Sequence, residues 1–230
     1  MTSASRILLT GFEPFAGDGH NPSWPAAREA AARLRDGAFP GSSLNAAELA
    51  GAVEAVAVEL PCSFTGSTEA FDRALADHRP DVVICCGLAG GRTEVAVERV
   101  ALNLQDARIP DNDGYQPAGE PVDDAGPAAY FSTLPVKRTV AALKGAAIPA
   151  ALSLSAGSFV CNHLFYVLMN RAPTVPLRSA GFVHVPWDHE HAPVSVPSLP
   201  AAQLTEALVI TALEALRPTS DLTVAAGELH

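Results

Sequence analysis

The chain has little of several features that point to particular classes of protein. Aromatic residues make up 6% of its 230 residues, and 15 basic residues stand against 25 acidic ones, giving a formal net charge of −10. A chain this acidic is a poor candidate for binding the phosphate backbone of nucleic acids, and it lacks the basic face that favours binding to a membrane surface. Its apolar residues form short runs, whereas a membrane-spanning helix needs about 20 in succession. We therefore expect no nucleic acid and no membrane among its partners.

Cysteine is also scarce, and its spacing indicates neither metal nor redox chemistry. The four cysteines are Cys62, Cys85, Cys86 and Cys161. They form no CxxC pair, and the vicinal two lie in an apolar run, where buried thiols are the simplest interpretation. The apolar run at 7–9 is broken by Gly11, whereas the core of a secretory signal needs roughly 7–15 apolar residues. We therefore expect a cytoplasmic protein.

What the chain does contain is an alternation of short apolar runs with helical patterns. Strands are expected at 7–9, 53–60, 82–86, 95–104, 150–154 and 181–185, and helices at about 23–34, 70–78, 136–143, 158–170 and 201–216. This alternation predicts an α/β fold: a single domain over 1–217, with a largely parallel, mixed and twisted sheet flanked by helices on both faces. Residues 106–134, rich in Asp, Pro and Gly, are expected to form a long functional or mobile loop. Residues 218–230 are expected to be a flexible C-terminal tail.

Candidate ligand-binding residues lie where the expected strands end, the usual position of sites in open α/β sheets. Phe12 and Phe15 flank a turn after the first strand, either as a hydrophobic plug over the sheet or as an apolar wall for a small ligand. The turn at 87–91 is rich in glycine but lacks the order of a nucleotide-binding loop. Glu98 and Arg99 are strand neighbours that face opposite ways, either as a surface pair or with the carboxylate held in a site by a partner.

Cys161 and His184 are the residues most suggestive of catalysis. Cys161 falls in the first turn of an expected helix, where the N–H groups favour a thiolate, although a small residue packed under the helix is an alternative. His163 is too close in the helix to face Cys161. His184 ends the last expected strand, so the two could form a Cys–His pair oriented by a carboxylate, unless His184 is structural.

Residues 188–191 hold several possible metal ligands. They read Asp-His-Glu-His, but adjacent positions rarely converge on one ion and no HExxH motif is present. We interpret them as a solvated loop, with a metal site as a minor alternative.

Seven segments together resemble the pyroglutamyl peptidase I family, whose members are also called pyrrolidone-carboxylate peptidases. They are 10–15 (TGFEPF), 87–92 (GLAGGR), 98–103 (ERVALN), 106–112 (DARIPDN), 130–135 (YFSTLP), 155–162 (SAGSFVCN) and 182–186 (FVHVP). They occur in the family's order over most of the chain. Residues 187–191 (WDHEH) depart from the Pro-Glu-Gln that often follows in relatives.

The resemblance implies a cytosolic cysteine exopeptidase, an omega peptidase that removes N-terminal pyroglutamyl residues from peptides through an acyl-enzyme. The family's catalytic glutamate, cysteine and histidine fall on Glu98, Cys161 and His184, and its pattern suggests Arg108 as an oxyanion donor. The implied substrate-binding residues are Phe12, Phe15, Leu88, Ile109, Phe159 and Val160. The resemblance implies no metal and no organic cofactor. It also implies a homo-oligomer, a dimer or tetramer.

Two other functions are compatible with parts of the pattern. One is a non-catalytic protein that binds pyroglutamyl or other lactam ends, against which the complete set of Glu98, Cys161 and His184 argues. The other is a nucleoside phosphorylase-like enzyme, which rests on analogy of fold alone.

Overall fold

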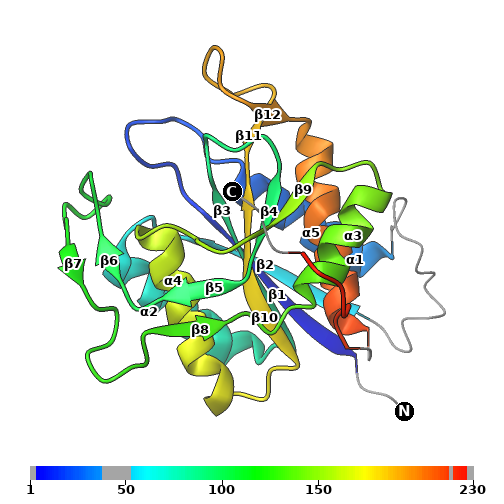
Figure 1. The fold of residues 1–230 in the computed structure, drawn as a ribbon, viewed down its shortest axis with the longest axis horizontal. Helices are drawn as coiled ribbons and strands as arrows, with labels where there is room; N and C mark the ends of the chain where they lie inside the picture. The colour runs from blue at the N-terminus through cyan, green and yellow to red at the C-terminus, as the bar shows by residue number, and fades with distance from the viewer. Residues whose placement is uncertain (1–3, 38–52, 218–219, 227–230) are drawn as a thin grey trace.

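The computed structural model describes residues 4–37, 53–217 and 220–226. Its strands are β1 (Ser5–Phe12), β2 (Val53–Leu60), β3 (Val82–Leu88), β4 (Val95–Glu98), β5 (Val100–Leu102), β6 (Gln105–Asp106), β7 (Ala118–Glu120), β8 (Ala129–Phe131), β9 (Ala150–Ser153), β10 (Ser179–Val185), β11 (Trp187–Asp188) and β12 (Ser198–Leu199). Its helices are α1 (Ser23–Asp36), α2 (Phe64–His78), α3 (Val136–Gly145), α4 (Val160–Arg171), the short 3₁₀ helix η1 (Ala172–Thr174) and α5 (Ala201–Leu216). Figure 1 labels these elements.

A six-stranded sheet forms the centre of the molecule. Its strand order is β2-β1-β3-β10-β4-β9, and every neighbouring pair is parallel except β10 and β4. The predicted α/β fold with a largely parallel, mixed sheet is therefore confirmed. The antiparallel contact sets Phe182 opposite Glu98 and His184 opposite Ala96. Glu98 and His184 are consequently diagonal neighbours on one face of the sheet, within reach of long side chains.

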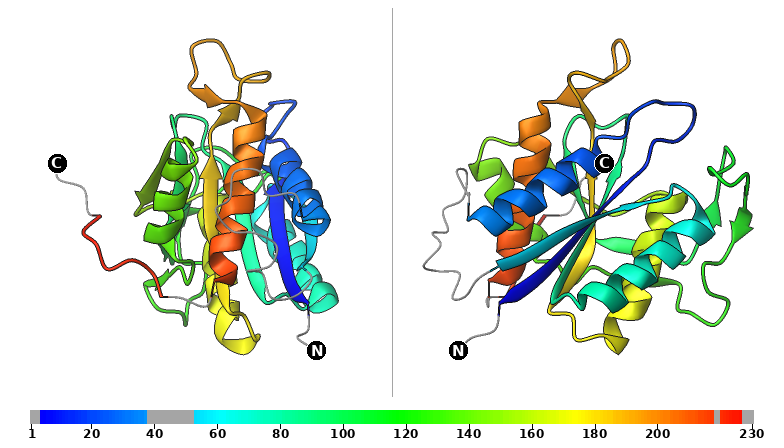
Figure 2. Two further views of the ribbon diagram at one scale, coloured as in Figure 1. Left: turned by 90° about the vertical axis from the view of Figure 1, so that its right-hand side faces the viewer. Right: turned by 180° about the vertical axis from the view of Figure 1, so that it is seen from behind.

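Helices cover both faces of the sheet, and each face has its own hydrophobic core. Helices α1, α3 and α5 pack on one face, and α2 and α4 pack on the other, as the two views in Figure 2 show. Successive strand residues alternate between these cores, so Cys86 belongs to the first and Cys85 to the second. Both thiols are fully buried, as the sequence predicts. By the same alternation, Glu98 and His184 face the side of the sheet that carries α4.

Three expected elements differ from those observed. The expected strand 95–104 breaks at Arg99, because β4 continues the main sheet whereas β5 turns away to pair with β8. Helix α2 begins at Phe64 rather than at 70, since burial of Phe64 and Ser67 stabilises a first turn whose residues have low helix propensity. The stretch 106–134 contains β7 and β8, which pair with β6 and β5.

The described part of the C-terminal segment lies against α3. The Asp221 carboxylate accepts hydrogen bonds from the backbone N–H groups of Lys137 (3.2 Å) and Arg138 (2.8 Å). Residues 218–219 and 227–230 lie outside the described residues, so the flexible tail and the domain boundary at 217 remain predictions. Among the described residues, no helix combines the length and apolar character needed to cross a bilayer.

Candidate active site

A buried histidine–carboxylate pair lies between β4 and β10. Nδ1 of His184 is 2.8 Å from Oε1 of Glu98, and Glu98 is completely buried. An ionised carboxylate can only accept hydrogen bonds, so Nδ1 donates its proton to Glu98. Nε2 is then left without a proton and can accept one from another group. The guanidinium of Arg92 lies 3.3 Å from the same Oε1 and also donates to the carbonyl oxygen of Ser155 (3.0 Å). In the sequence, Arg92 ends the 87–92 segment that resembles the family, but nothing there indicates its contact with Glu98.

Cys161 approaches the same pair from the start of α4. It is the second residue of this helix, and its sulfur lies directly over Gly87 of β3. A Cβ added to Gly87 would lie 2.6 Å from the Cys161 sulfur, so only glycine leaves room for the thiol. Gly87 is in turn the register partner of His184. Cys161 and His184 also line one pocket, which brings together the two residues that the sequence singled out.

Two effects act on the charge state of the Cys161 thiol. The start of a helix favours a thiolate, as the sequence analysis expects. Burial acts in the opposite direction and, with repulsion from the neighbouring thiols and Glu98, raises the pKa of Cys161 well above its usual value. Burial therefore opposes the thiolate that the start of the helix favours.

The pocket has a volume of about 880 Å³ and contains most of the residues suggested by the resemblance. The suggested residues that line it are Phe12, Phe15, Leu88, Arg108, Ile109, Phe159, Cys161 and His184. Glu98 lies behind His184, and the Val160 side chain is fully buried in the core, so neither is in the lining. Lining residues without a predicted role are Asn21, Cys62, Ala89, Arg92, Asp106, Ala156, Gly157 and Ser158.

An aromatic group forms the apolar part of the wall. The rings of Phe15 and Phe159 lie 6.0 Å apart, and Phe159 meets the ring of Phe64 edge-on at 5.5 Å. Ile109 completes this side and remains 42% exposed. The interpretation of Phe15 as an apolar wall, rather than a plug, therefore fits its position.

Acidic side chains hold the loops that carry this wall. Oε1 of Glu13 accepts hydrogen bonds from the N–H of Cys62 (3.0 Å) and from the side chain of Asn112 (2.8 Å). Glu13 thus ties its own loop to the segments that carry Cys62 and Asn112. Asp111 accepts from the backbone N–H groups of Phe64 and Tyr115, both at 2.9 Å. Sequence reasoning missed these anchors, because a carboxylate in a polar loop looks solvated until its partners are known.

The 188–191 segment differs from the solvated loop expected from the sequence. His189 and Glu190 are exposed, as expected, but Asp188 is only 3% exposed. Its partners are His191 and His20, and His20 is far away in the sequence.

An α/β fold with a pocket lined by a cysteine and a histidine, and with a buried glutamate bonded to that histidine, is the arrangement expected of a cysteine peptidase, a class of hydrolase. The family model described as pyroglutamyl peptidase matches residues 5–218, and the chain belongs to this family. The resemblance stated from the motifs is thereby confirmed, and the enzyme is a pyroglutamyl peptidase of type I.

Relatives match the chain almost from end to end. The pyrrolidone-carboxylate peptidase of Streptomyces coelicolor is 47% identical over 230 residues, which is 98% of this chain and 100% of the relative. A crystal structure of pyroglutamyl peptidase I from Bacillus amyloliquefaciens superposes with a TM-score of 0.85 at 42% identity, covering 96% of this chain and 100% of that one. A mutant pyrrolidone carboxyl peptidase from Pyrococcus furiosus gives 0.79 at 33% identity, over 92% of this chain and 98% of that one.

Proposed function

We propose that the chain hydrolyses the N-terminal pyroglutamyl residue of peptides with Cys161 as nucleophile, His184 as general base and acid, and Glu98 as the group that orients His184. One observation carries this proposal. The His184–Glu98 hydrogen bond of 2.8 Å is buried, and Gly87, the register partner of His184, is the residue over which the Cys161 sulfur lies. The proposed nucleophile and base thus line one pocket, and the proposed orienting carboxylate lies behind the base.

In the first half of the reaction, Nε2 of His184 takes the proton of the Cys161 thiol as the sulfur attacks the pyroglutamyl carbonyl carbon. This order of events suits a thiol whose pKa burial has raised, because the proton leaves only as the new bond forms. The carbonyl oxygen becomes an oxyanion. The backbone N–H of Cys161, which has no acceptor within α4, and the Arg108 guanidinium are the proposed donors to it.

In the second half, the intermediate collapses. The C–N bond breaks, the protonated His184 gives its proton to the leaving amine, and a thioester joins the pyroglutamyl group to Cys161. His184 then removes a proton from water, which attacks the thioester carbonyl. Collapse of this second intermediate releases pyroglutamate and returns the proton to the sulfur.

Glu98 and Arg92 have positioning roles. The buried carboxylate holds the His184 ring through Nδ1 and offsets the positive charge that the ring carries between the two halves of the reaction. Arg92 reaches the same carboxylate oxygen and is fixed by the carbonyl of Ser155. It therefore keeps the carboxylate of Glu98 in place while His184 changes charge.

The pocket accounts for selectivity toward a lactam. Phe15, Ile109 and Phe159 offer apolar surface that matches the faces of a neutral five-membered ring. Phe12 and the buried Val160 support this surface, and the backbone around Leu88 is proposed to bond the lactam N–H and C=O. An N-terminal glutamate would instead bring a charged amine and a carboxylate into the pocket, and their desolvation costs more than apolar contact returns.

Location and assembly form a second, smaller part of the proposal. We propose a cytoplasmic homo-oligomer, a dimer or tetramer, on the basis of the family resemblance. Phe131 and Leu154 are more than half exposed and are candidate subunit contacts. Light scattering coupled to size-exclusion chromatography tests the assembly.

The proposed chemistry is tested by release of aminocoumarin from its pyroglutamyl amide, before and after thiol alkylation. Cys161 is the partly exposed cysteine, whereas Cys62, Cys85 and Cys86 are buried, so iodoacetamide should label Cys161 first. Loss of release in proportion to labelling of Cys161, followed by peptide mass spectrometry, supports the proposal. Full release from fully labelled Cys161 contradicts it, and binding without release by the reduced, folded protein would indicate a non-catalytic binder.

A further inference from the structure

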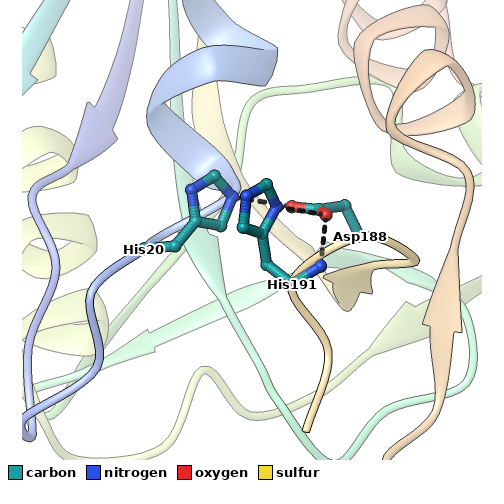
Figure 3. A group of neighbouring side chains, drawn as sticks. All are labelled: His20, Asp188 and His191. Atoms are coloured by element: carbon teal, nitrogen blue, oxygen red, sulfur yellow. Dashed lines mark hydrogen bonds and ion pairs between the residues drawn. The ribbon is translucent and has the colours of Figure 1, made fainter.

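Three side chains outside the catalytic machinery converge at one point. Figure 3 shows the two imidazole rings of His20 and His191 on the carboxylate of Asp188. Nε2 of His20 is 2.6 Å from Oδ2, and Nδ1 of His191 is 2.7 Å from Oδ1. The two rings are stacked with centroids 3.7 Å apart. One buried carboxylate thus receives two imidazoles from segments that lie far apart in the sequence.

The carboxylate is fixed in position. Its Oδ1 accepts from the backbone N–H groups of Glu190 (3.1 Å) and His191 (3.0 Å), which sets its orientation independently of the rings. The site therefore presents an oxygen ligand between two nitrogen ligands.

This ligand set and its geometry suit a transition metal. His20, Asp188 and His191 are the one cluster of three possible metal ligands among the described residues. Their ligand atoms all lie within 4.8 Å of one another. A Zn²⁺ ion binds imidazole nitrogen in the plane of the ring and carboxylate oxygen at about 2.0–2.2 Å, so the two stacked rings must rotate apart to admit an ion between these atoms. Imidazole ligands favour Zn²⁺ and its neighbours over Mg²⁺ or Ca²⁺. The side chains of His20 and His191 are 26% and 46% exposed, which leaves a route for the ion.

We propose that His20 Nε2, Asp188 and His191 Nδ1 form a binding site for a divalent transition-metal ion of the Zn²⁺ class. Each imidazole binds as the neutral ring with its proton on the other nitrogen, so the ion replaces the two histidine–aspartate hydrogen bonds. Three protein ligands leave the remaining positions to water. The site lies where 187–191 departs from the family pattern.

The ion would join two segments that build the catalytic pocket. His20 lies in the loop 13–22, which carries the lining residues Phe15 and Asn21. Asp188 follows β10, and its neighbour Trp187 packs so closely on the 87–92 turn that a Cβ on Gly90 would lie 2.7 Å from its Nε1. A metal bound here would therefore link the loop 13–22 to the segment after β10 beside the pocket. We expect it to raise the stability of the folded chain.

The test measures metal affinity in a tag-free, full-length chain carrying Cys161→Ala, so that the catalytic thiol cannot bind the ion. Co²⁺ is the probe, because it reports its ligands in the visible spectrum, and Zn²⁺ affinity follows by competition with Co²⁺. His20→Ala and His191→Ala are each expected to weaken both affinities by at least about tenfold. His189→Ala is the matched control, since this neighbouring histidine is exposed and bonds Ser198 instead; it should bind like the parent.

Thermal unfolding provides a second readout. Zn²⁺ should raise the Tm of the parent and of the His189→Ala chain but not that of the His191→Ala chain. Circular dichroism without metal shows whether each variant is folded. If the His20→Ala chain does not fold, the His191→Ala chain still tests the site. Parent-like affinity in the folded histidine variants, no binding to the parent, or a cobalt–thiolate band would overturn the proposal.

Discussion

At the scale of single residues, the proposed catalysis depends on space as much as on reactive groups. The sulfur of Cys161 can lie over Gly87, the register partner of His184, because position 87 has no side chain. A reacting atom displaced by about 1 Å commonly costs about a hundredfold in rate. The glycine is thus as important to the geometry as the proposed nucleophile.

Gly87→Ala should therefore lower kcat/KM by about a hundredfold or more while the chain stays folded. The added Cβ would lie 2.6 Å from the Cys161 sulfur and 3.0 Å from the Phe182 ring, so one of them must move. Gly91→Ala is the matched control in the same turn, because nothing lies within 4 Å of its added Cβ. Equal rates for the two variants would show that the sulfur is not held over Gly87.

A second residue links structure to pH. His163 is buried beside Phe64, and its Nε2 lies 2.8 Å from Thr68 Oγ1. Burial, opposed by a hydrogen bond to the Phe64 backbone, lowers the pKa of His163 from 6.5 to about 4. The unfolded chain therefore binds a proton more readily than the folded chain does. The stability contributed by neutral His163 is complete above pH 6.5 and is lost as the pH falls toward 4, by roughly 3 kcal/mol in all.

His163→Gln should flatten the decline of the unfolding free energy between pH 6.5 and 4, measured by urea denaturation. His189→Gln, a change at an exposed histidine, should leave the decline unchanged. The same slope in His163→Gln and the parent would contradict the assignment.

At the scale of elements, loops held by buried carboxylates shape the pocket. Asp111 accepts backbone hydrogen bonds from the start of α2 and from the turn that follows Ile109. Asp111→Ala would leave the buried N–H of Phe64 and the part-buried N–H of Tyr115 without this acceptor, at a cost of about 1–3 kcal/mol. It should also raise KM more than it lowers kcat, because the wall loosens while Cys161 and His184 stay in place.

Steady-state kinetics and denaturation of Asp111→Ala check this prediction against Asp113→Ala, a change at an exposed aspartate two residues away. A fall in kcat with unchanged KM would indicate that Asp111 acts on the chemistry instead.

The elements also show which parts of the structure the sequence could predict. Strands β3 and β10 are buried along their whole length because both faces of the sheet are covered, and their mostly apolar sequences made their carboxyl ends, with Gly87 and His184, predictable. The end of β4 could not be predicted in this way. The break at Arg99 arises because β5 pairs with β8, which lies further along the chain. For the same reason, alternation left the role of Glu98 open until the antiparallel register placed it diagonal to His184. The partners of Arg92, Asp111 and His20 are likewise set by tertiary contacts.

At the scale of the whole molecule, the face of the sheet that carries α1, α3 and α5 is tied to the C-terminal segment at α3. The buried Arg138–Glu214 ion pair (2.7 Å) joins α3 to α5, and Asp221 adds two hydrogen bonds to the first turn of α3. The pocket lined by Cys161 and His184 lies on the other face of the sheet. The C-terminal segment should therefore affect stability without affecting catalysis.

Deleting residues 218–230 should lower the Tm and leave kcat/KM unchanged. Asp221→Ala in the full-length chain should account for much of the loss, about 1 kcal/mol, because it removes the same two hydrogen bonds. A truncated chain that is fully stable, or one that is stable but inactive, would contradict this division between stability and activity.

The most direct test of the central claim is the rate of pyroglutamyl-aminocoumarin cleavage by Cys161→Ala beside Cys62→Ala. Both cysteines line the pocket, but only the Cys161 sulfur lies over the register partner of His184. We expect Cys161→Ala to lose about 10⁴-fold or more in kcat while retaining the fold, and Cys62→Ala to stay within about tenfold of the parent. Parent-like turnover by folded Cys161→Ala would contradict the account.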